Sequence, residues 1–235
     1  MIKQKLQETD WQNITEAMHA NGYAIIPNLL SDEQCEILKS EYLNPNAYRK
    51  TVVMERYHFG LGEYKYFNYP LPNIIQQIRA EIYPHLAPIA NAWFRALNID
   101  RQFPLEHWQL LEECKVNLQE KATVLILKYG EGGFNTLHQD LYGAVYFPMQ
   151  TVLFLNEPDK DFTGGEFVLT QQSPRAQSKA MVLKPNKGDM LIFTTNFKPQ
   201  KGTKGYYRVN MKHGVSEVKS GERYTLGIIF HDALS

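Results

Sequence analysis

The sequence predicts an α+β fold in which helices of the first half pack against an antiparallel β core formed by the second half. Two observations predict it. Before about residue 123 apolar residues recur mainly at three- and four-residue spacing, and after it they mostly alternate with polar ones. Short alternating segments separated by turn residues are typical of a sandwich or barrel such as a jelly roll. We expect one domain over residues 1–235, with 1–122 as helical support and 123–235 as the jelly-roll core.

Capping patterns place the first helices. Thr9 followed by Gln12 is a capping-box pattern, and Gly22 after an asparagine ends the helix that follows. Ser31 with Gln34 repeats the pattern and predicts a second helix to about residue 42. Residues 23–27, between them, predict a short strand.

Two further stretches complete the first half. Residues 72–98 predict one long amphipathic helix or a broken pair, and we expect Pro84 and Pro88 to kink it. Residues 42–69 are dense in aromatic side chains and glycine without a clear period. Either a loop or strands fit that composition, and the aromatic side chains form either a packed cluster or a wall that faces a substrate.

The second half predicts seven strands. They are bounded by turn sequences such as Gly132-Gly133 and Gly164-Gly165. We expect strands at residues 123–129, 150–155, 166–170, 180–183, 190–193, 206–215 and 223–230.

Composition excludes several classes of protein. Twenty-five basic residues balance twenty-five acidic ones, so the chain does not rely on overall positive charge to hold nucleic acid or lipid. Its two cysteines, Cys35 and Cys114, are too few for a thiolate metal cluster, and both fall in helix-like stretches, which disfavours a disulfide. Neither an apolar leader nor a run long enough for a membrane span is present in the sequence. We expect a cytoplasmic protein.

A metal site is indicated by three side chains. Residues two apart on an extended segment point to one side, so His138 and Asp140 project into one cavity. In residues 206–213 the same alternation puts His213 on the inward, apolar face of a late strand. Two imidazoles and one carboxylate are typical of the facial triad of non-haem Fe(II) oxygenases, which leaves metal positions open for a keto acid and dioxygen. Each of these histidines taken alone is more typical of a packing residue than of a ligand. We expect the other five histidines to be surface or packing residues, and His231 is the first candidate for an exception.

An anion site is indicated ten residues after His213. Arg223 and Thr225 share a strand face, and Gly227 on that face leaves space. A buried guanidinium beside a hydroxyl suits the terminal carboxylate of an organic acid.

These residues carry a family resemblance. His138, Asp140, His213 and Arg223 resemble the iron and 2-oxoglutarate residues of the 2-oxoglutarate/Fe(II) dioxygenase superfamily. The spacing from Tyr129-Gly130-x-Gly132-Gly133 to His-x-Asp is similar to the prolyl 4-hydroxylase branch, although collagen-type members have lysine where this chain has Arg223. Residues 59–67, 213–216 and 227–233 also resemble a bacterial oxygenase family labelled as acting on damaged DNA.

The resemblance implies a double-stranded β-helix that hydroxylates a C–H bond and releases succinate and CO2. It implies His138, Asp140 and His213 as ligands of Fe(II), and 2-oxoglutarate and O2 as cosubstrates, with ascorbate as a candidate reductant. It assigns Arg223, with Thr225, to the distal carboxylate of 2-oxoglutarate. Tyr129 lines the cosubstrate pocket or simply packs in the core.

The substrate stays open between two classes. From Lys179 to Lys212 eight basic residues face one acid, Asp189, and a lysine-rich loop at 197–205 could overhang the cavity. Phosphates of an alkylated nucleic acid would suit this patch, with aromatic residues there to stack a base; a solvated sheet face is the alternative. The prolyl-hydroxylase spacing and neutral net charge favour instead a protein or small-molecule side chain as substrate. A non-enzymatic cupin-like metal-binding module is a third alternative, although a cupin's usual His-x-His is absent from the sequence.

Overall fold

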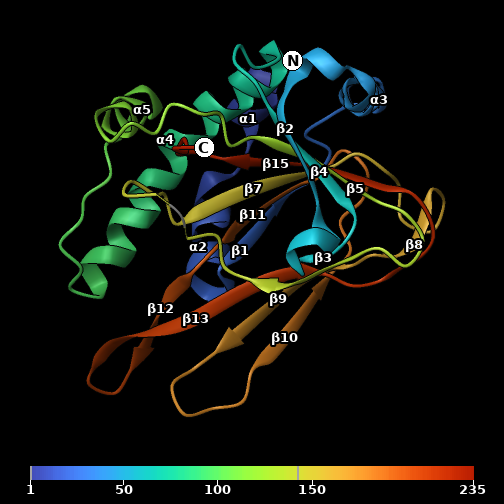
Figure 1. Ribbon diagram of the computed structural model, residues 1–235. Coiled ribbons are helices and arrows are strands. Elements are labelled where there is room, and N and C mark those ends of the chain that lie inside the picture. The colour runs from blue at the N-terminus through green and yellow to red at the C-terminus, as the bar shows by residue number, and fades with distance from the viewer. Residues whose placement is uncertain (1, 142) are drawn as a thin grey trace.

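The computed structural model describes residues 2–141 and 143–235 as a mixed α/β arrangement with extensive antiparallel sheets (Figure 1). All the α-helices of the described residues lie before residue 123 and most of the strands after it, although four strands within residues 23–67 also join the sheets. The α-helices of the described residues are α1 (Ile2–Glu8), α2 (Trp11–Asn21), α3 (Asp32–Ser40), α4 (Asn73–Ala96) and α5 (His107–Val116).

Short polar side chains set the helix starts, because they accept backbone N–H groups that have no partner within the helix. The capping box at α3 is confirmed: Gln34 N–H donates to Ser31 Oγ at 3.2 Å, and Ser31 N–H donates to Gln34 Oε1 at 2.9 Å. The prediction of Thr9 at the start of α2 is wrong by one residue. Asp10 is the cap, whereas the Thr9 hydroxyl donates to the Lys5 carbonyl oxygen at the end of α1.

The long helix predicted over 72–98 is confirmed as the single helix α4, with Pro84 and Pro88 inside it. One of its faces is buried throughout, and Arg79 is the only charged side chain on that face among the described residues. Hydrophobic burial therefore fixes α4 against the sheet, and Arg79 needs polar partners there.

All seven predicted strands are confirmed to within two residues at either end, and other segments add to them. The strands are β1 (Tyr23–Ile26), β2 (Tyr48–Val53), β3 (Gly60–Leu61), β4 (Glu63–Phe67), β5 (Leu125–Tyr129), β6 (Phe134–His138), β7 (Met149–Phe154), β8 (Phe162–Gly164), β9 (Phe167–Gln172), β10 (Lys179–Leu183), β11 (Met190–Thr194), β12 (Phe197–Gly202), β13 (Gly205–Val215), β14 (Val218–Gly221) and β15 (Arg223–Ile229).

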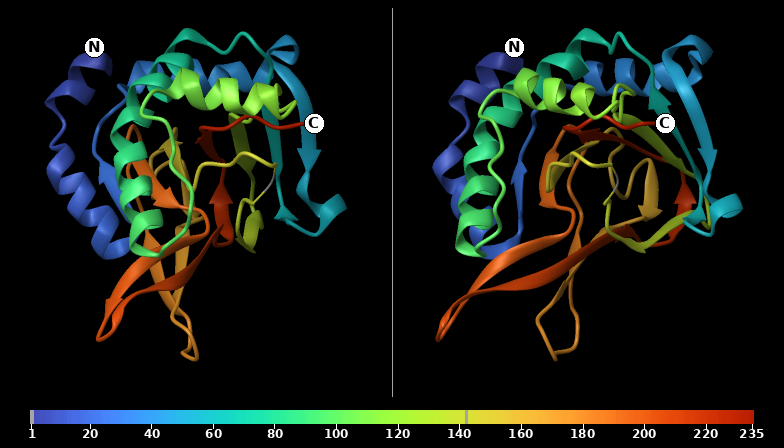
Figure 2. Two further views of the ribbon diagram at one scale, coloured as in Figure 1. Left: turned by 90° about the vertical axis from the view of Figure 1, so that its left-hand side faces the viewer. Right: turned by 60° about the vertical axis from the view of Figure 1, so that its left-hand side comes forward.

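Most of the strands belong to two large sheets. One has the order β1-β11-β7-β15-β5-β4-β2, and the other has the order β10-β9-β13-β6-β3 with β12 paired to β13. From β5 onward the chain passes back and forth between them, and β14 and β8 form a separate pair. Figure 2 shows the helices along the top and one side, while the β9–β10 and β12–β13 hairpins project from the other end.

Alternation along β15 separates the two faces of the seven-stranded sheet. Leu226 and Ile228 belong to the main hydrophobic cluster, which also holds residues of α4 such as Ile75 and Ile78. The intervening residues Thr225 and Gly227 face the other sheet. The space between the sheets is thus lined by one face of each strand.

Two segments for which the sequence predicted or allowed a loop contain strands. The aromatic stretch at 42–69 forms strands β2, β3 and β4, which decides between the loop and the strands. The lysine-rich loop predicted at 197–205 is wrong, because residues 197–202 form β12 of a hairpin. Glycines at its turn let the chain reverse, and composition alone does not distinguish such a strand from a loop.

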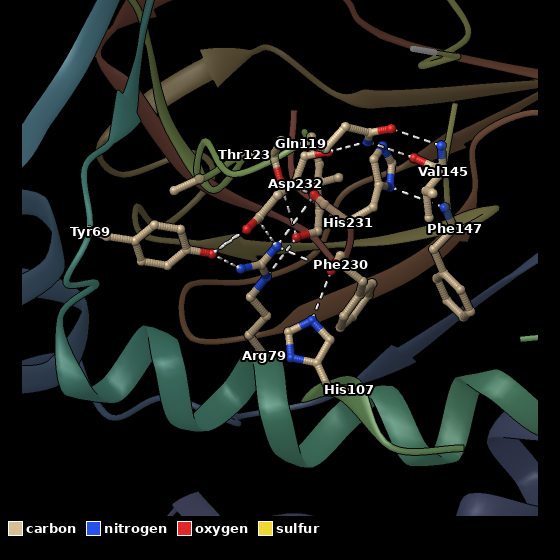
Figure 3. A network of polar contacts seen from close by, with 12 residues as sticks. Tyr69, Arg79, His107, Gln119, Thr123, Val145, Phe147, Phe230, His231 and Asp232 are labelled. Atoms are coloured by element: carbon tan, nitrogen blue, oxygen red, sulfur yellow. Dashed lines mark hydrogen bonds and ion pairs between the residues drawn. The ribbon is translucent and has the colours of Figure 1, made fainter. Parts of the chain in front are cut away.

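A buried polar network anchors the last strand to α4 (Figure 3). The Arg79 guanidinium donates to the Ile229 carbonyl oxygen at 2.9 Å, to Asp232 at 2.7 Å and to the Tyr69 hydroxyl at 2.7 Å. Nε2 of His107, on α5, donates to the Phe230 carbonyl oxygen at 2.8 Å. The network therefore fixes the C-terminal end of β15 and the segment after it.

Gln119 extends this network to the segment that follows residue 142 (Figure 3). Its Nε2 donates to the Val145 carbonyl oxygen at 2.8 Å, and its Oε1 accepts the Val145 N–H at 2.8 Å. The Phe147 N–H donates to His231 Nδ1 at 3.1 Å. His231 is therefore a packing residue, and its prediction as the foremost exception is wrong.

Cys35 and Cys114 are buried on α3 and α5 and form no disulfide, as predicted. Among the helices described, none has the length and apolar character needed to cross a lipid bilayer.

Candidate metal and anion site

A cavity of about 350 Å³ lies between the two sheets. It contains all the residues predicted to bind the metal or the cosubstrate, and apolar side chains surround them. The lining residues are Phe59, Tyr64, Tyr66, Leu125, Leu127, Tyr129, Asn135, Thr136, His138, Gln139, Asp140, Gln150, Val152, Phe167, Phe193, His213, Gly214, Val215, Arg223, Thr225, Gly227 and Ile229.

His138, Asp140 and His213 meet at one point of this cavity. His138 ends β6 and lies directly opposite His213 of β13 in the strand register. His138 Nε2 is 3.7 Å from Asp140 Oδ1, and His213 Nε2 is 3.4 Å from Asp140 Oδ2. Donor atoms of all three side chains lie within 4.8 Å of one another, so they could hold a single metal ion.

Hydrogen bonds orient two of these three side chains. Nδ1 of His138 is 2.7 Å from the Thr136 carbonyl oxygen, so it carries the proton and leaves Nε2 with a free lone pair. Gln150 Nε2 donates to Asp140 Oδ2 at 2.9 Å. Hydrogen bonds of this kind are typical of metal ligands, because they fix the tautomer of the imidazole and the direction of the lone pairs on the ligand atoms.

The electrostatics favour the protonation states that bind metal. Burial lowers the pKa of His138, and the neighbouring His213 lowers it further, so the imidazole is neutral near pH 7. Burial alone would raise the pKa of Asp140, but hydrogen bonds from His213 and Gln150 help to bring it below its usual value. Neutral imidazole and carboxylate are the required ligand forms.

His213 is held by aromatic rings. Its ring centroid lies 4.8 Å from that of Phe193 and 6.0 Å from that of Phe167. The side chain is buried, as alternation along β13 predicted, since Val209 and Met211 on the same face are buried too. This apolar setting keeps the imidazole in place from one side of the cavity.

Arg223 is a buried cation for which the described part of the chain supplies no anion. Its side chain is only 2% exposed, and its one hydrogen bond among the described residues is to Thr225 Oγ1 at 3.4 Å. Nε is buried with no partner there. Burial lowers the pKa of Arg223 to about 10, and the nearby Tyr129 and Glu166 offset only part of that effect. Isolated buried charge is unfavourable, so this guanidinium is suited to an incoming carboxylate.

Tyr129 lies beside this cation. Its side chain is fully buried, and the Arg223 guanidinium carbon is 5.5 Å from its ring centroid. Burial raises the pKa of Tyr129 to about 12, so its hydroxyl remains protonated and can donate. Tyr129 lines the cavity, as the first of its two predicted roles requires, namely lining a cosubstrate pocket.

The Gly164-Gly165 turn has a role at this site. Gly165 has φ +63°, and a Cβ there would lie 2.9 Å from Arg223 Cδ. Glycine is therefore needed both for the backbone conformation and for the close approach to the arginine.

Sequence reasoning missed other residues of the cavity. Gln150 is one, because nothing within its strand marks it as a partner of Asp140. Gln139 is another: its Nε2 donates to the Met211 carbonyl oxygen at 2.8 Å and so joins the His-x-Asp segment to β13. Tyr64 and Tyr66 were indicated only as part of an aromatic stretch, and both line the cavity, as the substrate-facing alternative requires.

The lysine-rich segment lies outside the site. No residue from 179 to 212 lines the cavity except Phe193. Lys198 and Phe197 are each 1% exposed, so neither is available for a phosphate or a base. The prediction that residues 197–205 overhang the cavity is therefore wrong.

The site and the chain match known oxygenases. The profile of the Oxygenase-NA family, described as an oxygenase catalysing oxidative methylation of damaged DNA, matches residues 62–233. The chain belongs to this family. Uncharacterized proteins from two strains of Mycobacterium tuberculosis are each 42% identical to this oxygenase over 169 residues, which is 71% of its length and 72% of theirs.

Solved structures share the oxygenase's fold. A prolyl-4-hydroxylase of Pseudomonas putida has a TM-score of 0.55 at 14% identity, over 95% of this chain and 100% of that one. An oxidoreductase of the 2OG-Fe(II) oxygenase family from Burkholderia pseudomallei has a TM-score of 0.54 at 13% identity, over 96% and 93%. The protein is thus an oxygenase by its family, and its fold is that of a structure from the 2OG-Fe(II) oxygenase family.

Proposed function

We propose that His138, Asp140 and His213 hold the ferrous ion, and that Arg223 binds the distal carboxylate of 2-oxoglutarate in the same cavity. The isolated guanidinium carries this proposal, because a buried cation without an anion is explained by an acidic ligand. Thr225 adds a hydroxyl beside it. Two imidazoles and a carboxylate fit Fe(II) with open positions. When bound, iron supplies the oxidation of 2-oxoglutarate by O2 to succinate and CO2, with hydroxylation of a substrate C–H bond.

The protein's own contribution is positioning and exclusion of water. Thr136 and Gln150 hold the ligand side chains in their binding orientation. Apolar residues such as Phe167 and Val152 line the cavity around the polar groups and limit the access of water to them. The burial of Arg223 strengthens its attraction to a carboxylate.

For the fold we propose a double-stranded β-helix within a single domain. The alternation of consecutive strands between two antiparallel sheets supports the first assignment. The shared cluster of helical and strand residues supports the second, since Ile75 of α4 and Ile126 of β5 belong to one core. A cytoplasmic location stays a prediction.

For the substrate we propose an alkylated nucleic acid, oxidised at the alkyl carbon. The description of the family, which names damaged DNA, supports this class. The alternative is hydroxylation of a protein or amino-acid side chain. The prolyl-hydroxylase spacing before His138 supports it, and one structure of the same fold is a prolyl hydroxylase with a hypoxia inducible factor peptide fragment from Trichoplax adhaerens (TM-score 0.51 at 14% identity, over 97% of this chain and 91% of that one). The non-enzymatic alternative is set aside, because the chain belongs to an oxygenase family.

Succinate formation with Fe(II), 2-oxoglutarate and ascorbate tests the proposal. We expect slow formation by the protein alone and stimulation by alkylated DNA, with proline-rich peptides and free amino acids as the competing candidates. His138→Ala should abolish it, with His85→Ala as the matched control, since His85 stacks on Trp11 outside the cavity. Full turnover in His138→Ala would refute the metal assignment.

Arg223→Lys tests the cosubstrate assignment separately. The variant should need more 2-oxoglutarate while its metal affinity is retained, because a lysine cannot reproduce the two-pronged guanidinium contact. Lost metal binding with an unchanged 2-oxoglutarate requirement would contradict the assigned role.

A further inference from the structure

A second, smaller recess of about 260 Å³ adjoins the cavity next to β2 and β4. Tyr64 and Tyr66 line both spaces, so the recess and the cavity meet at these two side chains. Arg49 and Lys50 of β2 also line the recess. Among the described residues, no aspartate or glutamate side chain lines it. The recess is therefore a basic extension of the cavity.

The strand register shows that Lys50 belongs to the cavity side of the seven-stranded sheet. Lys50 lies opposite Tyr66, and Tyr66 lies opposite Leu125. Leu125 in turn lies opposite Gly227, and both of these residues line the cavity. Opposite residues in a sheet point to the same face. The one register shift between β2 and β4 precedes Lys50, so the pairing from Lys50 to Val53 is regular.

The two cations of the recess are held differently. Arg49 Nε donates to the Ala122 carbonyl oxygen at 2.8 Å, and the guanidinium carbon lies 4.8 Å from the centroid of the Tyr66 ring. These contacts fix a positive charge on the aromatic wall of the recess. Lys50 is exposed and forms no ion pair with any of the described residues. Its ammonium group is therefore available to an anion from outside the chain.

This basic recess is separate from the position of Arg223. Arg223 lies opposite Tyr129, which is four residues along β5 from Leu125, and β15 is three strands away from β2. At roughly 3.4 Å per residue and 4.8 Å per strand, the backbones of Arg223 and Lys50 are about 20 Å apart. In the proposed function, 2-oxoglutarate uses one end at Arg223 and the other at the metal. An anion in the recess therefore belongs to the other substrate.

Two phenol rings lie between the recess and the metal ligands. The centroids of Tyr64 and Tyr66 are 5.4 Å apart, and the ring planes are nearly perpendicular at 88°. Burial raises the pKa of both tyrosines, and the charge of nearby Asp140 adds to the rise, so both hydroxyls stay protonated. Aromatic rings with hydroxyl groups suit a nucleobase, which offers a ring face and a hydrogen-bonding edge.

We propose that the recess binds a phosphate group of the substrate through Arg49 and Lys50, while the base next to that phosphate packs against Tyr64 and Tyr66 and enters the cavity. This rests on the proposed function, since it specifies how a nucleic-acid substrate is held. Two cations meet in the recess, whereas Arg223 alone is assigned to the carboxylate of the keto acid. Guanidinium and ammonium groups together are typical partners of phosphate.

The experiment measures binding of a fluorescent single-stranded oligonucleotide with one alkylated base, by anisotropy with Mn²⁺ and 2-oxoglutarate present. Lys50→Ala should weaken binding about two- to fivefold, the range for one exposed charge contact. Lys50→Glu should weaken it further by repulsion, and Lys50→Arg, which keeps the charge, should restore it. Lys201→Ala is the matched control, because Lys201 is an exposed lysine of β12 outside both the recess and the cavity.

The second measurement removes the charge from the oligonucleotide. A methylphosphonate oligonucleotide of the same sequence keeps its bases, so Lys50→Ala and the unaltered protein should bind it equally. With the ordinary oligonucleotide, the log–log slope of affinity against salt should become shallower by about 0.7 in Lys50→Ala, the value for one phosphate on a single strand. An equal loss with both oligonucleotides would overturn the inference. So would weaker binding by Lys201→Ala together with normal binding by Lys50→Ala.

Three outcomes separate this inference from the proposed function. If the unaltered protein forms succinate but Lys50→Ala and Lys50→Glu bind the oligonucleotide normally, only the inference fails. The inference also fails if an acidic or a proline-rich peptide binds and the oligonucleotide does not. If the unaltered protein forms no succinate with Fe(II), the proposed function fails irrespective of binding.

Discussion

Two arginines are buried in this molecule to almost the same extent and in opposite chemical situations. Arg79 is 0% exposed and Arg223 is 2% exposed. Arg79 donates to Asp232, to the Tyr69 hydroxyl and to backbone carbonyl oxygens, as Figure 3 shows. Arg223 has one hydroxyl at 3.4 Å and a buried Nε without a partner among the described residues.

The pKa values express the same difference. Burial opposes the charge of Arg79, but Asp232 and Tyr69 outweigh it and raise its pKa. At Arg223 burial prevails and lowers the pKa to about 10. A buried cation therefore stabilises the fold where the protein supplies its anion, and is suited to ligand binding where the protein does not.

The largest effect is expected at the paired arginine. Arg79→Met leaves Asp232 buried without its cation and removes three hydrogen bonds to backbone carbonyl oxygens. It should lower the free energy of unfolding by about 3–5 kcal/mol, the range for breaking a buried ion pair. Chemical denaturation measures this. A loss below about 1 kcal/mol would contradict a structural role for Arg79.

The unpaired arginine should behave in the opposite way. Arg223→Met removes a buried charge for which the described residues supply no anion, so the free energy of unfolding should stay within about 1 kcal/mol or rise. Binding of 2-oxoglutarate should weaken by about 2–5 kcal/mol, measured by calorimetry with Mn²⁺ present. If Arg223→Met strongly lowered the free energy of unfolding and left the affinity for 2-oxoglutarate normal, Arg223 would be a structural residue like Arg79.

Two carboxylates differ in a similar way. Asp232 forms an ion pair with Arg79, whereas Asp140 accepts a hydrogen bond from the neutral amide of Gln150. Gln150→Leu removes the donor to Asp140 Oδ2. Metal affinity should fall about 10- to 100-fold, the usual effect of losing a hydrogen-bond partner of a ligand. Titration with Mn²⁺ tests this, with Gln172→Leu on the exposed end of β9 as control. Unchanged affinity would leave Gln150 as a packing residue only.

The smallest effect is expected in the pH dependence of folding stability. Burial, and then the charge of Arg79, lower the pKa of His107 to about 3 from its usual value of 6.5. Between these values the unfolded chain binds the proton and the folded protein does not, so stability falls as pH falls below 6.5. From pH 7 to 5.5 this imidazole should account for about 1 kcal/mol. His107→Gln, which keeps a donor to Phe230, should flatten the pH dependence by that amount, and an unchanged slope would contradict it.

Local patterns in the sequence predict much of this structure. Alternation along residues 206–213 correctly places His213 inward, because Val209 and Met211 mark the buried face of the strand. The capping box at Ser31 is found because both partners lie within one turn. Thr9 misleads because Asp10 beside it is an equally good cap, and only the geometry of α1 decides between them.

The rest depends on contacts between distant parts of the chain. Arg79 and Asp232 are 153 residues apart, and no local pattern joins them. Gln150 and Asp140 lie on a strand and a loop whose approach follows from sheet order. The lysine-rich hairpin shows the converse, since composition revealed its charge but not that Lys198 is buried or that Lys187 is paired.

A crystal structure of the protein grown with Mn²⁺ and 2-oxoglutarate would show both ligands in place. We expect the ion to be bound by His138, Asp140 and His213, with the far carboxylate of the keto acid on the guanidinium of Arg223. An ion bound elsewhere, or a cosubstrate carboxylate that leaves Arg223 without an anion, would contradict this expectation.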